Sequence, residues 1–214
     1  MMNAELQHLL AESPVVPVVT IQDPASAVPL AQALIDGGVP VIEITLRTAA
    51  AFDAIRAIKS EIPQAIVGAG TVLNSRDIDR AIEAGSEFIV TPGTTSSLLK
   101  SAVSCGLPFM PGVSTVSDLM CCLEQGLNTL KFFPAEAAGG TAVLKAFAGP
   151  FPDVRFCPTG GIGLHNLAEY FAIPSVISVG GTWIAPTRLI ESGDWKGITR
   201  LAMEARQKIA TVLE

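Results

Sequence analysis

The sequence contains little charge and no long hydrophobic run, and both absences exclude classes of protein. Charged residues make up 16% of the 214 residues, below the roughly 25% typical of soluble domains. Lys and Arg number 14 against 20 Asp and Glu, a net charge of −6, which disfavours binding to nucleic acid or to an anionic membrane surface. No apolar run reaches the roughly 18–20 residues that a membrane-spanning helix needs.

Histidine and cysteine are also scarce. The only histidines, His8 and His165, lie far apart in the sequence, so no His-rich metal site is expected and we predict metal-independent chemistry without a cofactor. The 4 cysteines show no C-x-x-C spacing and are predicted to be reduced structural thiols of a cytoplasmic protein. The first basic residue is Arg47, so a secretory signal with a positive start is not expected.

The apolar residues that are present fall in short segments. These segments span 14–21, 41–47, 65–72, 88–93, 108–113, 129–134, 155–161 and 175–181. Ala- and Leu-rich helical segments separate them, a pattern typical of parallel βαβ units. Eight such units in about 210 residues predict an α/β fold, a (β/α)8 TIM barrel, as one domain over 1–214. No G-x-G-x-x-G follows the first strand, which disfavours an open doubly wound sheet.

The sequence predicts an extra N-terminal helix near residues 3–12, before the first strand. We expect this helix to cover the N-terminal mouth of the barrel, because active sites of such barrels lie at the opposite, C-terminal face.

One lysine departs from the pattern of its strand. Lys131 lies inside an apolar strand, whereas the other lysines fall in predicted helices. Alternation places Lys131 with Thr129 and Phe133 on one face and Leu130 and Phe132 on the other, helix-facing side. Lys131 should therefore point into the barrel, where removal from water favours a neutral amine that can attack a carbonyl. The alternative is a buried structural ion pair.

Glu43 is the acidic residue in the middle of a strand. It shares a face with Arg47, which lies nearer the C-terminal mouth. The second and sixth strands of an eight-stranded barrel are opposed and contribute to the same interior layers, so Glu43 can reach Lys131 across the core. A carboxylate there can form a salt bridge or shuttle protons for an amine that forms an iminium.

Three glycine turns end strands of the predicted barrel. TGG at 159–161 and GGT at 180–182 follow the last two strands, where barrels of this class bind phosphate through backbone N–H groups. GAGT at 68–71 is expected beside Arg47, and together they could hold a carboxylate.

The runs VVPV, EITLRT, VGAGTVLN, PGVST, LKFFPAE, FCPTGGI and GGTW resemble those of the class I 2-keto-3-deoxy-6-phosphogluconate (KDPG) aldolases. Some members of that family also act on 4-hydroxy-2-oxoglutarate. The resemblance implies a homotrimeric barrel, a lyase that cleaves its small-molecule keto acid to pyruvate and glyceraldehyde 3-phosphate through a Schiff base and without metal.

The resemblance also implies a role for individual residues. Lys131 is similar to the Schiff-base lysine, and Glu43 to the general acid/base. The substrate-binding positions are Arg47 and Thr71 for the pyruvate carboxylate, Pro92 lining that site, Thr159 governing the stereochemistry of aldehyde addition, and Gly160, Gly161, Gly181 and Thr182 for the phosphate.

Two residues depart from the family pattern. Thr182 stands where relatives often carry Ser, and it keeps the hydroxyl. Gly163 stands where relatives often carry Ser or Thr, and it removes a helix-capping hydroxyl. The intact TLRT after Glu43 favours the gluconate-type substrate over the galactonate type.

Three other functions are compatible with parts of this pattern. One is a 2-keto-3-deoxy-6-phosphogalactonate aldolase. A second is a sugar-phosphate isomerase or epimerase, which would give Lys131 no covalent role. The third is a non-catalytic sugar-phosphate sensor, in which Lys131 and Glu43 form a purely structural pair.

Overall fold

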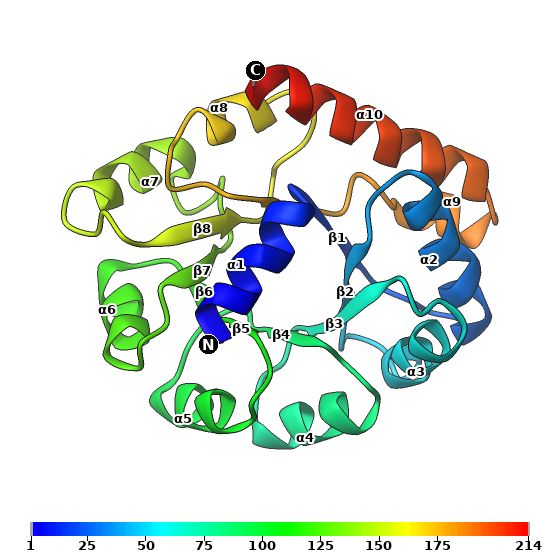
Figure 1. The fold of residues 1–214 in the computed structure, drawn as a ribbon, viewed down its shortest axis with the longest axis horizontal. Helices are drawn as coiled ribbons and strands as arrows, with labels where there is room; N and C mark the ends of the chain where they lie inside the picture. Colours follow the sequence, from blue (N-terminus) through cyan, green and yellow to red (C-terminus); the bar gives the residue numbers. More distant parts are fainter. Residues whose placement is uncertain (1, 214) are drawn as a thin grey trace.

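Helices and parallel strands alternate along the chain in the computed structural model, which describes residues 2–213 (Figure 1). The strands are β1 (Val15–Val19), β2 (Val41–Thr45), β3 (Ile66–Gly70), β4 (Phe88–Val90), β5 (Phe109–Met110), β6 (Gly112–Val113), β7 (Thr129–Phe132), β8 (Arg155–Pro158) and β9 (Val179–Gly181). The helices are α1 (Met2–Glu12), the short 3-10 helix η1 (Pro24–Ser26), α2 (Ala27–Asp36), α3 (Ala51–Glu61), α4 (Ser75–Glu83), α5 (Ser96–Ser104), α6 (Val116–Glu124), α7 (Gly140–Ala148), α8 (Leu167–Phe171), α9 (Thr187–Glu191) and α10 (Trp195–Leu213). Residues 1 and 214, the ends of the predicted domain, lie outside the described range.

The strands form two parallel sheets with the helices on the outside. One sheet has six strands in the order β5-β4-β3-β2-β1-β9, and the other has three in the order β6-β7-β8. Figure 1 shows the strands arranged around a common centre, with α2 to α10 at the periphery and α1 across the centre. The chain is therefore an α/β protein with parallel strands, as the alternation of strands and helices predicted.

The predicted strand over 108–113 is wrong as a single element. The structure divides it into β5 and β6, with Pro111 between them. Proline has no N–H to donate to a neighbouring strand, whereas the carbonyl of Pro111 still accepts from the N–H of Lys131 at 2.9 Å.

The predicted strand over 175–181 is also shorter than expected, because β9 begins at Val179. Before it, Val176 meets β8 only through an isolated parallel bridge to Phe156, and Thr159 and Gly180 form a second one. These bridges lie between the three-stranded sheet and the strand at one edge of the six-stranded sheet.

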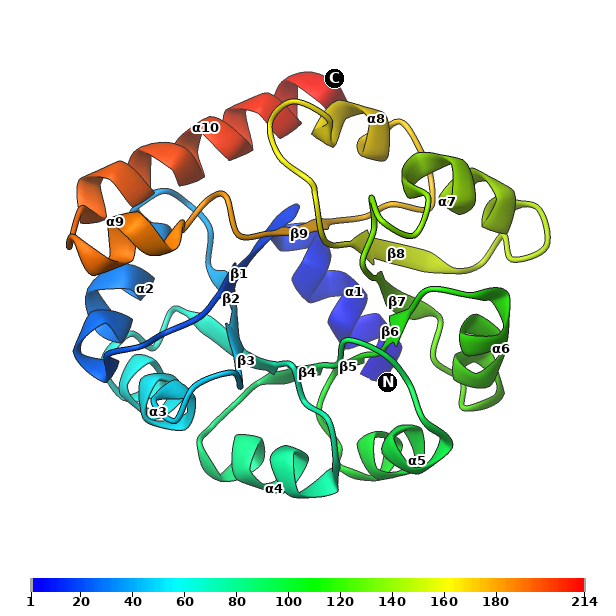
Figure 2. The same cartoon turned by 180° about the vertical axis from the view of Figure 1, so that it is seen from behind.

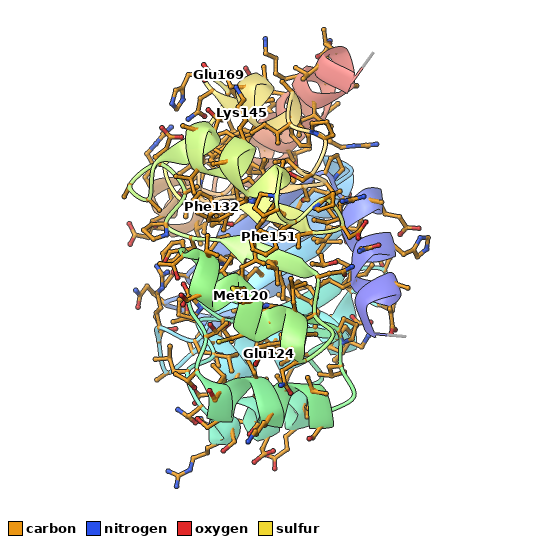
Figure 3. The ribbon with its side chains drawn as sticks, turned by 90° about the vertical axis from the view of Figure 1, so that its left-hand side faces the viewer. Met120, Glu124, Phe132, Lys145, Phe151 and Glu169 are labelled. Carbon is orange, nitrogen blue, oxygen red and sulfur yellow. The ribbon has the colours of Figure 1, made fainter. Side chains whose placement is uncertain are left out.

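The outer face of β7 packs against a helix, as the alternation in its sequence predicted. Leu130 and Phe132 are fully buried, and the ring of Phe132 meets that of Phe147 in α7 edge-on, with centroids 6.1 Å apart and planes at 82°. In Figure 3, Phe132 lies beneath the outer helices. The opposite face of β7 is left to Thr129 and Lys131.

Helix α1 lies across the end of the molecule where the strands begin. Leu6 and Leu10 are fully buried in a cluster with Val16 and Val41, which lie near the starts of β1 and β2. Gln7 donates a hydrogen bond to Thr129 Oγ1 at 2.9 Å, at the first residue of β7. Figure 2 shows the other end of the molecule, with α1 behind the strands.

The longest helix, α10, packs against α2 on the outside of the molecule (Figure 1). Of the helices in residues 2–213, none combines the length and the apolar content required to cross a bilayer.

Candidate active site

A cavity of about 210 Å³ opens where the strands end. Its lining residues come from β1, β7 and β9 and from the turns that follow most of the strands: Val18, Arg47, Thr71, Pro92, Lys131, Phe133, Thr159, Gly160, Gly161, Ile162, Gly181 and Thr182. Every site residue predicted from the sequence is in this set except Glu43, which lies directly behind Lys131. A cavity of this size suits a small molecule.

Lys131, which lines the cavity, forms a buried ion pair with Glu43 behind it. Lys131 Nζ lies 2.9 Å from Glu43 Oε1 and 3.1 Å from Oε2, and the two side chains are only 6% and 2% exposed. They come from β7 and β2, 88 residues apart in the sequence. The predicted meeting of the two residues across the core is confirmed.

Gly70 provides the space that the Glu43 carboxylate occupies. A Cβ at residue 70 would lie 2.2 Å from Glu43 Oε1, far inside van der Waals contact. The sequence interpretation of GAGT considered only a turn near a ligand and missed this role. The sequence did contain a signal for this role, because Gly70 lies at the end of the strand that follows the Glu43 strand and could neighbour it.

Arg47 and Thr71 stand together at one side of the cavity mouth. Arg47 Nε donates to Thr71 Oγ1 at 3.3 Å, and Arg47 is exposed. Thr71 has a φ of 59°, a left-handed conformation that is unusual for a β-branched residue. A guanidinium beside a hydroxyl can hold a carboxylate.

The turn after β8 forms the opposite side of the cavity. Gly160 and Gly161 have φ values of 106° and 78°, in the region that favours glycine. Within residues 2–213, the N–H groups of Gly161 and Ile162 have no acceptor in the protein. Free N–H groups in a glycine turn are suited to bind an anion.

Gly180 has a different role from the one expected of it. A Cβ at residue 180 would lie 2.2 Å from Thr159 Oγ1, so Gly180 makes room for Thr159, whereas Gly181 and Thr182 line the cavity. Thr159 is itself buried.

Cys157 lies beside Lys131 in the β7–β8 register. Burial raises the pKa of the Cys157 thiol to about 12, although the nearby charge of Lys131 opposes the shift. The thiol stays protonated at neutral pH, so it is not the nucleophile of this site.

Phe133 and two aliphatic residues complete the lining. Lys131 Nζ lies 5.6 Å from the centroid of the Phe133 ring, within the range of a cation–π contact; the sequence placed Phe133 on this face. Val18 and Ile162 were missed, because an aliphatic residue in an aliphatic strand or beside a glycine turn carries no chemical signal.

Asn166 holds the turn in which Gly163 lies. Its Oδ1 accepts from the N–H of Gly163 at 2.9 Å. The sequence predicted that glycine at residue 163 removes a hydroxyl that caps a helix. Helix α8 begins only at Leu167, so the missing hydroxyl belongs to the turn before the helix.

Among the described residues, no group of three or more His, Cys, Asp and Glu side chains is arranged to hold a metal ion.

The chain is similar to a family of enzymes over most of its length. A family model described as KDPG and KHG aldolase matches residues 6–201. The KHG/KDPG aldolase of Escherichia coli K12 is 52% identical over 199 residues, 93% of each chain. The 2-dehydro-3-deoxy-phosphogluconate aldolase of Pseudomonas aeruginosa PAO1 is 47% identical over 208 residues, 97% of this chain and 94% of its own.

Solved structures resemble this fold closely. The KDPG aldolase of Legionella pneumophila, with pyruvate captured as a covalent carbinolamine intermediate, has a TM-score of 0.91 and 44% identity over 93% of this chain and 97% of its own. The Zymomonas mobilis ZM4 enzyme with 3-phosphoglycerate has a TM-score of 0.90 and 46% identity over 95% of both chains.

Proposed function

Because the chain belongs to the KDPG and KHG aldolase family, we propose that Lys131, Glu43 and the two anion-binding sides of the cavity carry out its reaction. The protein is a lyase, a class I aldolase that cleaves 2-keto-3-deoxy-6-phosphogluconate to pyruvate and glyceraldehyde 3-phosphate. Cleavage of 4-hydroxy-2-oxoglutarate to pyruvate and glyoxylate is its second proposed reaction. The observation that carries the residue roles is the buried ion pair of Glu43 with Lys131, whose side chain lines the cavity.

The first half of the reaction joins the substrate to Lys131. A proton passes from Nζ to the Glu43 carboxylate, and the neutral amine attacks the C2 ketone of the substrate to give a carbinolamine. Protonated Glu43 then gives its proton to the C2 hydroxyl, which leaves as water, and a cationic iminium remains on Lys131. The Legionella relative holds pyruvate as a carbinolamine, which supports this sequence of steps.

The second half breaks the C3–C4 bond. The Glu43 carboxylate takes the proton of the C4 hydroxyl, C4 becomes the aldehyde carbon, and the electron pair of the C3–C4 bond moves into the iminium to give an enamine. Glu43 returns the proton to C3. Water then hydrolyses the resulting iminium, which releases pyruvate and the free amine of Lys131. Since one carboxylate serves several steps, its removal should slow each of them.

The two sides of the cavity position the substrate for these steps. Arg47 and Thr71 hold the carboxylate next to the ketone, and Pro92 lines that end. Gly160, Gly161, Gly181 and Thr182 hold the phosphate. The Zymomonas relative was solved with a phosphorylated three-carbon acid, which supports a phosphate-binding end. Two fixed ends align C2 with Nζ and lower the entropic part of the barrier.

Thr159 is proposed to set the face of the aldehyde. It is buried directly after β8, the strand next to that of Lys131. A hydroxyl between the nucleophile and the phosphate end is placed to bind the aldehyde oxygen.

We also propose that the whole chain, 1–214, is one closed (β/α)8 barrel with α1 over its N-terminal mouth. The two isolated bridges between the β8 and β9 segments and the short break at Pro111 support closure of the two sheets into one ring. A cytoplasmic homotrimer is the proposed state of the protein, and sedimentation equilibrium measures its mass.

Borohydride reduction in the presence of pyruvate tests the proposed chemistry. The expected result is a reduced pyruvyl adduct on Lys131, found by mass spectrometry of peptides. Lys131→Ala should abolish both adduct and turnover. Glu43→Gln should lower kcat by more than the roughly 10²–10⁴ usual for acid–base catalysis in a single step.

Lys145→Ala, at an exposed position of α7, is the matched control and should change neither quantity. An adduct on another lysine, or the absence of any adduct in the wild-type protein, would overturn the assignment of Lys131.

A further inference from the structure

The turn that lines the phosphate end of the cavity has little stiffness of its own. Residues 160, 161 and 163 are glycines, and Gly160 and Gly161 adopt left-handed conformations. Glycine loses more backbone freedom on ordering than any other residue. The shape of this turn therefore depends on groups outside it.

Asn166 supplies two of these groups from one side chain. Its Oδ1 accepts from the N–H of Gly163 at 2.9 Å, and its Nδ2 donates to the carbonyl of Gly161 at 3.1 Å. The N–H of Asn166 in turn donates to the carbonyl of Gly163 at 3.2 Å. Asn166 therefore closes the turn that precedes α8 through both its backbone and its side chain.

From this geometry we propose that Asn166 is a positioning residue for the phosphate of the substrate, an inference that rests on the proposed function. In a trans peptide the C=O and the following N–H point in opposite directions. Because Nδ2 holds the carbonyl of Gly161, the N–H of Ile162 must point away from Asn166. Ile162 lines the cavity, and its N–H has no acceptor within residues 2–213.

The opposite side of the turn is held by its contact with Glu136. A Cβ at Gly161 would lie 2.5 Å from Glu136 Cγ, and the N–H of Glu136 donates to the carbonyl of Gly160 at 3.1 Å. Tyr170 donates its hydroxyl proton to Glu136 Oε1, so this carboxylate already has a partner in α8. Asn166 thus completes a turn that is held on both sides, with its free N–H groups left for an anion.

A comparison of two substrates that differ only in the phosphate tests the proposal. In Asn166→Ala, the KM for 2-keto-3-deoxy-6-phosphogluconate should rise about tenfold or more, the effect of losing hydrogen bonds that order a charged-ligand site. The kinetics with unphosphorylated 2-keto-3-deoxygluconate should be unchanged, and pyruvate should still be trapped on Lys131.

Thr115→Ala is the matched control. Thr115 Oγ1 also accepts a backbone N–H at the start of a helix, from Asp118 at 3.2 Å. The turn that it holds, residues 114–118, lines no part of the cavity, whereas the turn held by Asn166 does. Its loss should lower the Tm without changing the preference for the phosphorylated substrate. Equal loss of activity on both substrates in Asn166→Ala, or no change on either, would overturn the proposal.

Binding of inorganic phosphate gives a readout that does not depend on catalysis. Phosphate should raise the Tm of the wild type and of Thr115→Ala, and should not raise that of Asn166→Ala or of Asn166→Asp, in which the donor to Gly161 is lost. Stabilisation of all four proteins to the same extent would contradict the role of Asn166. Failure of borohydride trapping in the wild type would instead contradict the proposed function, and leaves this readout intact.

Discussion

Lys131 and Glu43 are the residues whose burial is hardest to explain without chemistry. An ion pair removed from water is a weak source of stability, because the desolvation of both charges offsets most of their attraction. A purely structural role would leave the cavity above Lys131 and the open N–H groups opposite it without a purpose. These features support the proposed roles of Lys131 as the reactive amine and of Glu43 as its proton carrier.

At the scale of single residues, the strand alternation predicted which side chains point inward. Lys131, Glu43 and Arg47 could be chosen from the sequence because each is a charged residue within or next to an apolar strand. The small residues could not be assigned in the same way. Gly70 and Gly180 make room for Glu43 and Thr159 from neighbouring segments, and such contacts depend on the register between strands.

Gly70→Ala should displace Glu43 from Lys131. The added methyl group would lie 2.2 Å from Glu43 Oε1, so the carboxylate must move by an ångström or more. A misplacement of this size can lower kcat by about a hundredfold, and steady-state kinetics would measure it.

Gly149→Ala is the control for this substitution, because the nearest atom to its added Cβ is 4.0 Å away and the residue follows α7, away from the cavity. Activity of Gly70→Ala close to that of Gly149→Ala would contradict the packing role of Gly70.

At the scale of elements, the alternation along β7 divides its residues between two tasks. Lys131 serves the cavity, while Phe132 anchors the strand against Phe147 of α7. The sequence predicted this division because successive side chains of a strand point to opposite faces, and the single charged residue, Lys131, marks which face points inward. It did not predict where β5 ends. The break at Pro111 depends on the missing N–H of proline and on the different partners of the two short strands, since β5 pairs with β4 and β6 pairs with β7.

Phe132→Ala should destabilise the fold by about 3–5 kcal/mol, the usual cost of removing a buried aromatic ring. Urea unfolding monitored by circular dichroism would measure the change. Phe151→Ala, at a half-buried position visible in Figure 3, should cost less. Equal costs for the two variants would show that the contact of Phe132 with α7 adds nothing.

At the scale of the whole molecule, the site is assembled from almost every strand, and the sequence could predict this only through the fold. Arg47, Thr71, Pro92, Lys131 and Thr159 are spread over more than a hundred residues, and they meet because the parallel strands all end on one side. The resemblance to a family identified the residues, and the architecture brought them together. The hydrogen bonds of Asn166 to Gly161 and Gly163 were not predicted, since they depend on the path of the turn after β8.

Stability should fall when the pH rises above about 9. Burial raises the pKa values of the Cys122 and Cys157 thiols from 9.0 to about 12. Between these values the unfolded thiols lose their protons while the folded ones keep them, so each thiol favours unfolding progressively. At pH 10 each contributes a loss of about 1–2 kcal/mol.

Urea unfolding at pH 7.5 and pH 10 would measure this effect. Cys157→Ala should show a smaller difference between the two pH values than the wild type, even if it is less stable at both. Cys121→Ala, which removes an exposed thiol, is the control. A pH difference in Cys157→Ala equal to that of the wild type would contradict the linkage.

The position of α1 has a consequence for the order of events during turnover. Leu6 and Leu10 of α1 are buried where the strands begin, and the cavity opens at the opposite end, where the strands end, so the substrate and both products use the same opening. The two products cannot pass through this opening together, and pyruvate remains covalently bound to the enzyme after the C3–C4 bond is cleaved. The phosphorylated aldehyde must therefore leave first and pyruvate second. Added pyruvate should then compete with the substrate for the free enzyme, and added aldehyde should react with the pyruvate that is still bound to it.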